Sequence, residues 1–173
     1  AFSTARNSVP DNFPKNILEK EVKEATNMLG IQDENLIIFK YRVRELPKYR
    51  QDILEELIKL KSKSNYDLVL MPSLKDIHQD HVTIAKEGLR AFKDTSILSY
   101  ELLWNNFEFN ANCFVSLSNE NIQKKCESIK CYKSQGDRNY MNQEFITSMA
   151  RSRGVQASVN YAEAFEVIRL IVK

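Results

Sequence analysis

Both histidines of the chain lie in one short stretch, Asp76-Ile77-His78-Gln79-Asp80-His81, three residues apart and with two acids beside them. A neutral imidazole is the commonest protein ligand for zinc, and a catalytic zinc usually has three protein ligands plus water. A second imidazole near the metal can hydrogen-bond a reacting carbonyl or transfer a proton, and a carboxylate can orient such a ring. His-x-x-His alone is a weak signal, since two surface histidines near a turn more often have no such role.

The segments on either side place the two histidines where α/β proteins bind ligands. The apolar run at 67–72 predicts a buried strand, and the spacing of apolar residues at 82–92 predicts a helix. The imidazoles would then lie in the turn after a strand and at the start of a helix. In open α/β sheets, ligands bind outside the carboxyl ends of the strands.

Apolar strands and amphipathic helices alternate along the chain. We predict strands at 36–39, 68–71, 96–100 and 113–117, followed by an apolar tail at 167–172. We predict helices at 16–29, from 47, at 82–92, from about 118 and at about 140–152. This βαβ succession predicts a three-layer, Rossmann-like α/β domain with a mainly parallel sheet, in which the strands near Leu36, Leu68 and Ile97 lie side by side. We expect a single domain over residues 1–173.

Composition excludes several classes of protein. The net charge of +2 gives no indication of nucleic-acid or anionic-membrane binding. No apolar run is long enough to span a membrane, and no signal peptide is visible. The three cysteines include no Cys-x-x-Cys pair, which suits a reducing compartment. We therefore expect a cytoplasmic protein.

The segment His78-Gln79-Asp80-His81 resembles the His-x-Asp-His motif of the LmbE/PIG-L zinc-dependent deacetylases. Further motifs occur in the order typical of that family: a Glu-x3-Ala-x3-Leu-Gly helix at 21–30, a Lys and Ser-Gln signature at 130–135, and Ala-Glu-x-Phe at 162–165. The resemblance covers most of the chain. It implies an LmbE-like fold and a zinc-dependent hydrolase that removes the acetyl group from an N-acetylglucosaminyl-type sugar.

The sequence also departs from the family pattern. The family's His-Pro-Asp-Asp motif, which supplies a His and an Asp to zinc and a second Asp as general base, would precede residue 1. We therefore expect an N-terminally incomplete domain that binds zinc weakly or not at all and lacks deacetylase activity by itself. A missing first strand would leave a sheet edge open to pairing, so we also expect a homo-oligomer or a separate N-terminal piece. Gln79 stands at a position where the family frequently has Pro, and Leu18 stands at a position where the family often has Arg.

The resemblance implies a role for each candidate residue. His81 would be the zinc ligand, His78 would face the scissile acetamide, and Asp80 would orient the ring of His78. Four further residues are expected at the substrate rim: Asp76, Tyr100, Glu101 and Glu163. Helix capping for Asp76 and ordinary hydrogen bonding for the other three are equal alternatives.

Two other functions stay open from the sequence. The chain could be a non-catalytic relic of a deacetylase that binds an N-acetylated sugar, a glycoconjugate or another partner. A nucleotide-binding Rossmann-like domain is less well supported, because the sequence has no Gly-x-Gly-x-x-Gly motif.

Overall fold

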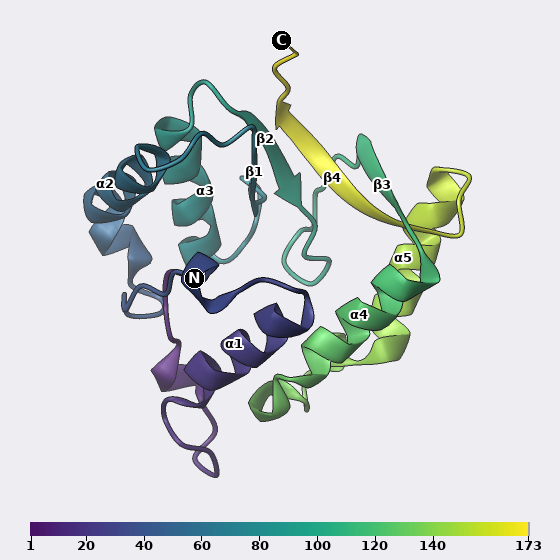
Figure 1. Ribbon diagram of the computed structural model, residues 1–173, viewed down its shortest axis with the longest axis horizontal. Helices are drawn as coiled ribbons and strands as arrows, with labels where there is room; N and C mark the ends of the chain where they lie inside the picture. Colours follow the sequence, from purple (N-terminus) through teal and green to yellow (C-terminus); the bar gives the residue numbers. More distant parts are fainter. Residues whose placement is uncertain (173) are drawn as a thin grey trace. The chain divides into compact units, whose positions relative to one another are not determined.

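The computed structural model describes residues 1–172, which group into two compact units (Figure 1). One unit contains residues 1–43 and 115–163, and the other contains residues 44–114 with the C-terminal residues from 164 on. Strands β3 (Cys113–Leu117) and β4 (Tyr161–Arg169) each pass from one unit into the other. The expected single domain over residues 1–173 stays a prediction.

The strands described between residues 1 and 172 form one four-stranded sheet in the order β1-β2-β4-β3. Strands β1 (Leu68–Pro72) and β2 (Ser96–Tyr100) pair in parallel, whereas β4 runs antiparallel to β2 (Figure 1). The predicted α/β class is confirmed, as is the parallel pairing of the strands near Leu68 and Ile97. The sheet is mixed rather than mainly parallel, because the C-terminal segment forms a strand that returns in the opposite direction.

The predicted strand at 36–39 does not belong to this sheet. It forms two hydrogen bonds with the first residue of the chain: the amine of Ala1 donates to the carbonyl of Ile37 (2.5 Å), and the N–H of Phe39 donates to the carbonyl of Ala1 (2.8 Å). The rings of Phe2 and Phe39 also stack, with centroids 5.2 Å apart. The prediction that this segment lies in a sheet beside the Leu68 strand is therefore wrong.

In the unit that holds the histidines, two helices pack on each other, α2 (Arg50–Lys61) and α3 (Gln79–Ala91), and α3 also packs on β1. A carboxylate at this helix pair, that of Glu87, is completely buried. It is paired on both oxygens, with Arg50 at 2.7 Å and Arg90 at 2.5 Å. A buried charge is tolerated only when it is paired, and the contact with Arg50 of α2 also links the two helices, whereas Arg90 lies on α3 itself.

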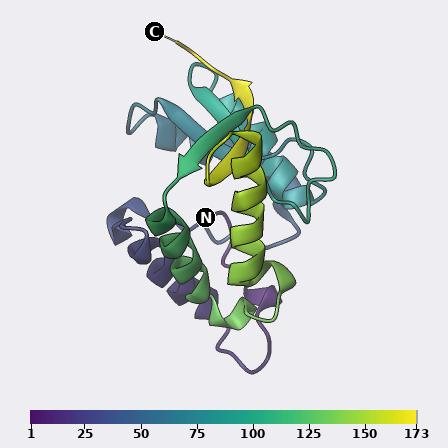
Figure 2. The same cartoon turned by 90° about the vertical axis from the view of Figure 1, so that its right-hand side faces the viewer.

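The other unit is built on three helices, α1 (Ile17–Met28), α4 (Asn119–Lys130) and α5 (Gln143–Gln156), with α4 in contact with both others (Figure 2). Two of the family-like motifs meet here. The buried carboxylate of Glu21 accepts hydrogen bonds from the backbone N–H (2.8 Å) and the hydroxyl (2.6 Å) of Ser134. This contact fixes the turn that follows α4 against α1.

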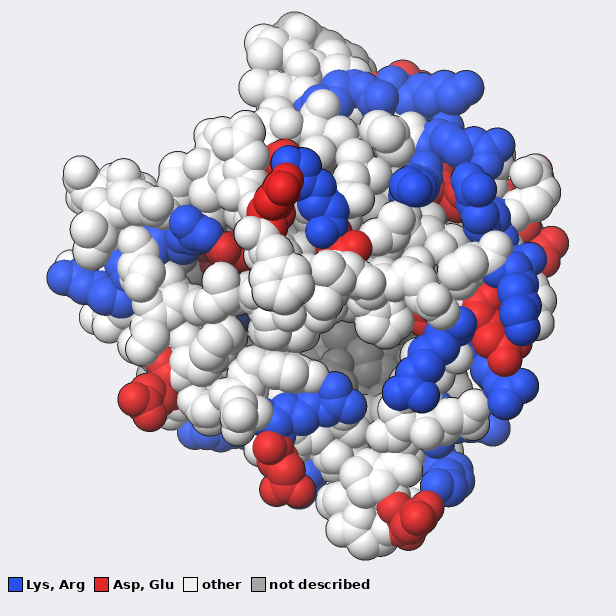
Figure 3. All heavy atoms as spheres, turned by 180° about the vertical axis from the view of Figure 1, so that it is seen from behind, with Lys and Arg blue, Asp and Glu red and all other residues white. Residues whose placement is uncertain are grey.

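Charged side chains of both signs are mixed on the face shown in Figure 3. This mixture agrees with the small net charge of the chain. Across residues 1–172, none of the helices has the length and apolar character needed to cross a bilayer.

Candidate functional site

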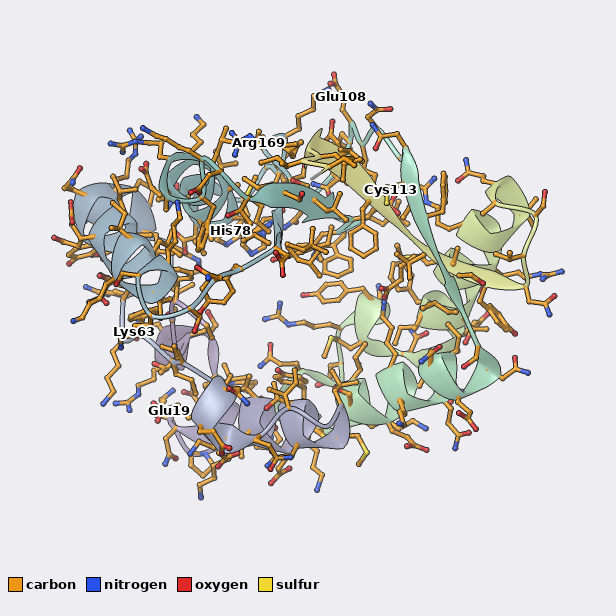
Figure 4. All side chains as sticks on the ribbon, turned by 45° about the horizontal axis from the view of Figure 1, so that its top comes forward. Glu19, Lys63, His78, Glu108, Cys113 and Arg169 are labelled. Carbon is orange, nitrogen blue, oxygen red and sulfur yellow. The ribbon has the colours of Figure 1, made fainter. Side chains whose placement is uncertain are left out.

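The candidate site is the turn between β1 and α3. Strand β1 ends at Pro72, α3 begins at Gln79, and His78 is the residue that caps the helix (Figure 4). This confirms the predicted order of strand, histidine turn and helix. The imidazoles therefore lie at the carboxyl end of a parallel strand, where α/β proteins commonly bind ligands.

Asp76 organises this turn. Its side chain is completely buried, and one carboxylate oxygen accepts a hydrogen bond from the N–H of His78 at 2.7 Å. The other oxygen lies 2.8 Å from Nδ1 of His81. Because a carboxylate can only accept, we assign the proton of the His81 ring to Nδ1, which leaves a lone pair on Nε2. Nε2 can then bind a metal ion or accept a proton.

His78 is held in the opposite tautomer. Its Nδ1 accepts a hydrogen bond from the N–H of Asp80 at 3.2 Å, so a neutral His78 ring carries its proton on Nε2. The two rings stack on each other, with centroids 4.6 Å apart and planes inclined by 24°. The pair therefore offers one nitrogen acceptor, on His81, and one N–H donor, on His78.

Asp80 makes contacts that differ from those expected. Its buried carboxylate accepts hydrogen bonds from the N–H of Arg44 at 2.5 Å and from the N–H of Leu46 at 3.2 Å. Asp80 meets the ring of His78 through its backbone N–H, whereas the sequence led us to expect its carboxylate there. The carboxylate beside an imidazole is that of Asp76, and the ring beside it is that of His81.

Tyr100 and Glu101 come from the neighbouring strand. Tyr100 is the last residue of β2 and lies opposite Pro72 of β1, at the same carboxyl edge as the histidine turn. Burial, together with the negative charge of Asp76, raises the pKa of Tyr100 to about 12. Its hydroxyl therefore keeps its proton at neutral pH and can donate a hydrogen bond. Glu101 directly follows this strand and is half-buried.

Sequence reasoning missed Asn105, which contacts the turn directly. Its carbonyl accepts a hydrogen bond from the N–H of Ile77 at 3.1 Å, and its side-chain amide lies 3.4 Å from Nδ1 of His81. The only signal in the sequence was the richness in Asn of the loop at 105–112.

Glu163, the remaining candidate, belongs to the other compact unit. It lies on β4, and its carboxylate pairs with the side chain of Lys125. Its expected role at the substrate rim stays a prediction.

The histidine turn provides only part of the donor set that a zinc site needs. His81 can serve as one zinc ligand, since Asp76 orients its ring and leaves Nε2 available. Within residues 1–172, however, no three His, Cys, Asp or Glu side chains are grouped so that they could hold a metal ion. A catalytic zinc usually needs three protein ligands. These residues therefore do not fit a complete zinc site.

We expect this chain to bind zinc weakly. After incubation with zinc and gel filtration, elemental analysis should find well below one equivalent of metal per chain, because one imidazole does not retain zinc against water and buffer. His81→Ala should remove the residual binding, and His78→Ala should leave it unchanged. One retained zinc per chain would contradict this prediction and would require ligands among residues not recognised as such.

The sequence model of the PIG-L family, described as GlcNAc-PI de-N-acetylase, matches residues 6–92. No curated protein sequence matches the chain significantly.

Solved structures at 18–19% identity share the fold. GalB, the 4-carboxy-2-hydroxymuconate hydratase from Pseudomonas putida, matches with a TM-score of 0.79 and 18% identity over 100% of this chain and 84% of its own. The conserved protein TT1542 from Thermus thermophilus has a TM-score of 0.75, 19% identity and coverages of 99% and 81%. N,N'-diacetylchitobiose deacetylase from Pyrococcus horikoshii has a TM-score of 0.74, 19% identity and coverages of 96% and 70%.

Proposed function

The chain belongs to the PIG-L family, and from this premise we propose that it hydrolyses the acetamide of an N-acetylated sugar of the N-acetylglucosaminyl type. The products are acetate and a free amine on the sugar. The observation that carries the proposal is the pair of stacked imidazoles in opposite tautomers, His78 and His81. Hydrolysis of an acetamide needs a proton donor for the carbonyl oxygen and the departing amine, and a lone pair that can hold a water-activating metal, and this pair offers both.

In the proposed reaction, the oxygen of water bonds to the acetyl carbon, the C–N bond breaks, and the departing nitrogen takes a proton. Negative charge develops on the carbonyl oxygen, where a fixed donor is most effective. Nε2–H of His78 is such a donor, and it can also protonate the amine. Nε2 of His81, oriented by Asp76 at the other ring nitrogen, is the lone pair that would hold the metal, and a metal there would supply an activated water.

Zinc is the cofactor that we propose, with His81 as the ligand from this chain. Since the described donor set is incomplete, the steps assigned here involve only side chains of this chain. The deacetylase from Pyrococcus horikoshii, which has this fold, supports the reaction class. The hydratase GalB has the same fold, so the fold alone does not select deacetylation.

The incomplete donor set favours a second candidate, a non-catalytic domain that binds N-acetylated sugars. The two candidates differ in turnover but not in sugar binding.

The test is an assay of amine and acetate release from N-acetylglucosaminyl glycosides, with and without zinc in large excess over protein. We expect equal amounts of both products only with zinc in large excess, which offsets the weak binding to a single imidazole, and no turnover of the chain by itself without added zinc. Sugar binding by calorimetry without any product in either condition would instead support the non-catalytic candidate. The absence of both binding and turnover would reject both candidates.

A further inference from the structure

A hollow of about 390 Å³ opens between α4 and α5, in the unit that does not hold the histidine turn. This volume lies in the range of roughly 300–1,000 Å³ that small-molecule sites usually have. The floor of the hollow is apolar, because Ile122 and Cys126 of α4 are buried there and Tyr161 packs against the same cluster. The floor can therefore take an apolar group of a ligand.

Two side chains of opposite charge line this hollow, Glu127 and Lys130 of α4. They are three residues apart on the helix, so they are neighbours on one face. Neither forms an ion pair with another residue of the described chain, and each has a carboxamide beside it instead. Gln123 donates to one carboxylate oxygen of Glu127 at 2.9 Å, and Nζ of Lys130 lies 3.4 Å from Oε1 of Gln143. The hollow therefore presents one anion and one cation that are not neutralised by the protein.

The ends of the two helices favour a particular arrangement of ligand charge. Lys130 is the last residue of α4, Gln143 is the first residue of α5, and both line the hollow. A helix N-terminus stabilises an anion, and a helix C-terminus stabilises a cation. The start of α5 and the Lys130 ammonium would thus both stabilise a ligand carboxylate. The last turn of α4, with the carboxylate of Glu127, would stabilise a ligand ammonium.

Thr147 of α5 adds an uncharged polar group to the wall of the hollow. A threonine hydroxyl inside a helix commonly donates to the carbonyl four residues earlier. Thr26 donates in this way to Val22, and Thr83 donates to Gln79, both at 2.8 Å. The hydroxyl of Thr147 has no such partner among residues 1–172. It is therefore available to a ligand.

We propose that this hollow binds a free α-amino acid with an apolar side chain. The ammonium of Lys130 and the side-chain N–H of Gln143 hold its carboxylate. Its ammonium is held by Glu127 and the hydroxyl of Thr147, and its side chain lies on the floor at Ile122. An α-amino acid carries one charge of each sign close together and no net charge, which complements the Glu127–Lys130 pair. This site is separate from the histidine turn and does not depend on hydrolytic activity.

Calorimetric titration of the whole chain with L-leucine tests the proposal, and two derivatives of leucine serve as matched ligands. Leucinamide lacks the carboxylate, and N-acetyl-leucine lacks the ammonium. L-leucine should bind with one molecule per chain. Each derivative should bind about 10-fold more weakly, since a hydrogen bond between charged partners is worth at least about that factor.

Two variants remove one charge each from the hollow. Lys130→Gln and Glu127→Gln should each lower the affinity for L-leucine about 10-fold. Glutamine at position 127 keeps an acceptor for Gln123, and thermal unfolding checks that both variants stay folded. Lys124→Gln is the matched control, because Lys124 is exposed on α4 and does not line the hollow. It should leave the affinity unchanged.

Three results would overturn the proposal: no binding of L-leucine at millimolar concentration, equal affinity for L-leucine and either derivative, or equal affinity of the hollow variants and Lys124→Gln. Leucine binding that is lost in His81→Ala and kept in Lys130→Gln would assign the ligand to the histidine turn and would also overturn it.

Discussion

Replacement of His78 by alanine is expected to lower the turnover of N-acetylated sugars by about 10²–10⁴-fold, the usual contribution of a general acid or base. Its Nε2–H is the donor that the proposed reaction uses at the carbonyl oxygen and the departing amine. Because His78 donates only as charge develops, kcat should fall far more than KM rises. Steady-state kinetics of amine release with zinc in excess measure both constants.

His78 also caps α3, so the alanine variant removes two functions at once. Its Nδ1 accepts from the N–H of Asp80, and loss of such a cap costs about 1 kcal/mol of stability. His78→Asn is the control, because asparagine is a good helix cap but lacks the Nε2–H of the imidazole. It should keep the stability and still lose the turnover. If either variant instead abolishes the residual zinc binding, the roles of the two histidines are reversed.

The order of strand, histidine turn and helix could be predicted from the sequence, because the patterns that indicate these elements lie close together in the chain. An apolar run, a pair of histidines and a helical repeat follow each other within 25 residues, at 68–92. Each of these signals depends on neighbours in the sequence, so β1 and α3 were expected almost where they lie, at Leu68–Pro72 and Gln79–Ala91.

The errors in the fold come from partners that are distant in the sequence. No strand was predicted at β4, whose last residues were assigned to an apolar tail at 167–172, because it pairs with β2, more than 60 residues earlier. Helix α5 was expected to end near Ser152, but it continues to Gln156. A Cβ on Gly154 would lie 2.6 Å from the carbonyl oxygen of Asn160, so this glycine permits a close approach of the following chain. The helix propensities of the residues do not indicate that another part of the chain approaches Gly154 so closely.

The errors in the site have the same origin. Asp76 and Asp80 both flank His78 in the sequence, and spacing does not show which carboxylate faces a ring. The folded turn directs Asp76 inward to His81, whereas the position of Asp80 on the first turn of α3 directs it to the loop at 44–46. Asn105 reaches His81 from 24 residues away. A short sequence motif cannot indicate a contact between residues that lie this far apart in the chain.

Replacement of Asp80 by alanine is expected to lower the free energy of unfolding by about 2–3 kcal/mol, as measured by urea denaturation. The replacement removes two hydrogen bonds from backbone N–H groups, one to each oxygen of the charged carboxylate, and leaves the N–H of buried Leu46 without its acceptor. Asp80 also holds Arg44 at a φ of 69°, in the left-handed region that non-glycine residues disfavour by about 1–2 kcal/mol. The carboxylate therefore stabilises a strained loop.

Two further variants separate this structural role from a catalytic one. Asp80→Asn keeps one carbonyl acceptor and should lose less stability than Asp80→Ala. Arg44→Gly relieves the strain and should recover about 1 kcal/mol in the Asp80→Ala background. The backbone N–H of Asp80, which donates to Nδ1 of His78, is unchanged in all of them, so kcat per folded molecule should stay close to that of the unmodified protein. A stable Asp80→Ala variant that loses turnover as His78→Ala does would show instead that the Asp80 carboxylate acts on the His78 ring.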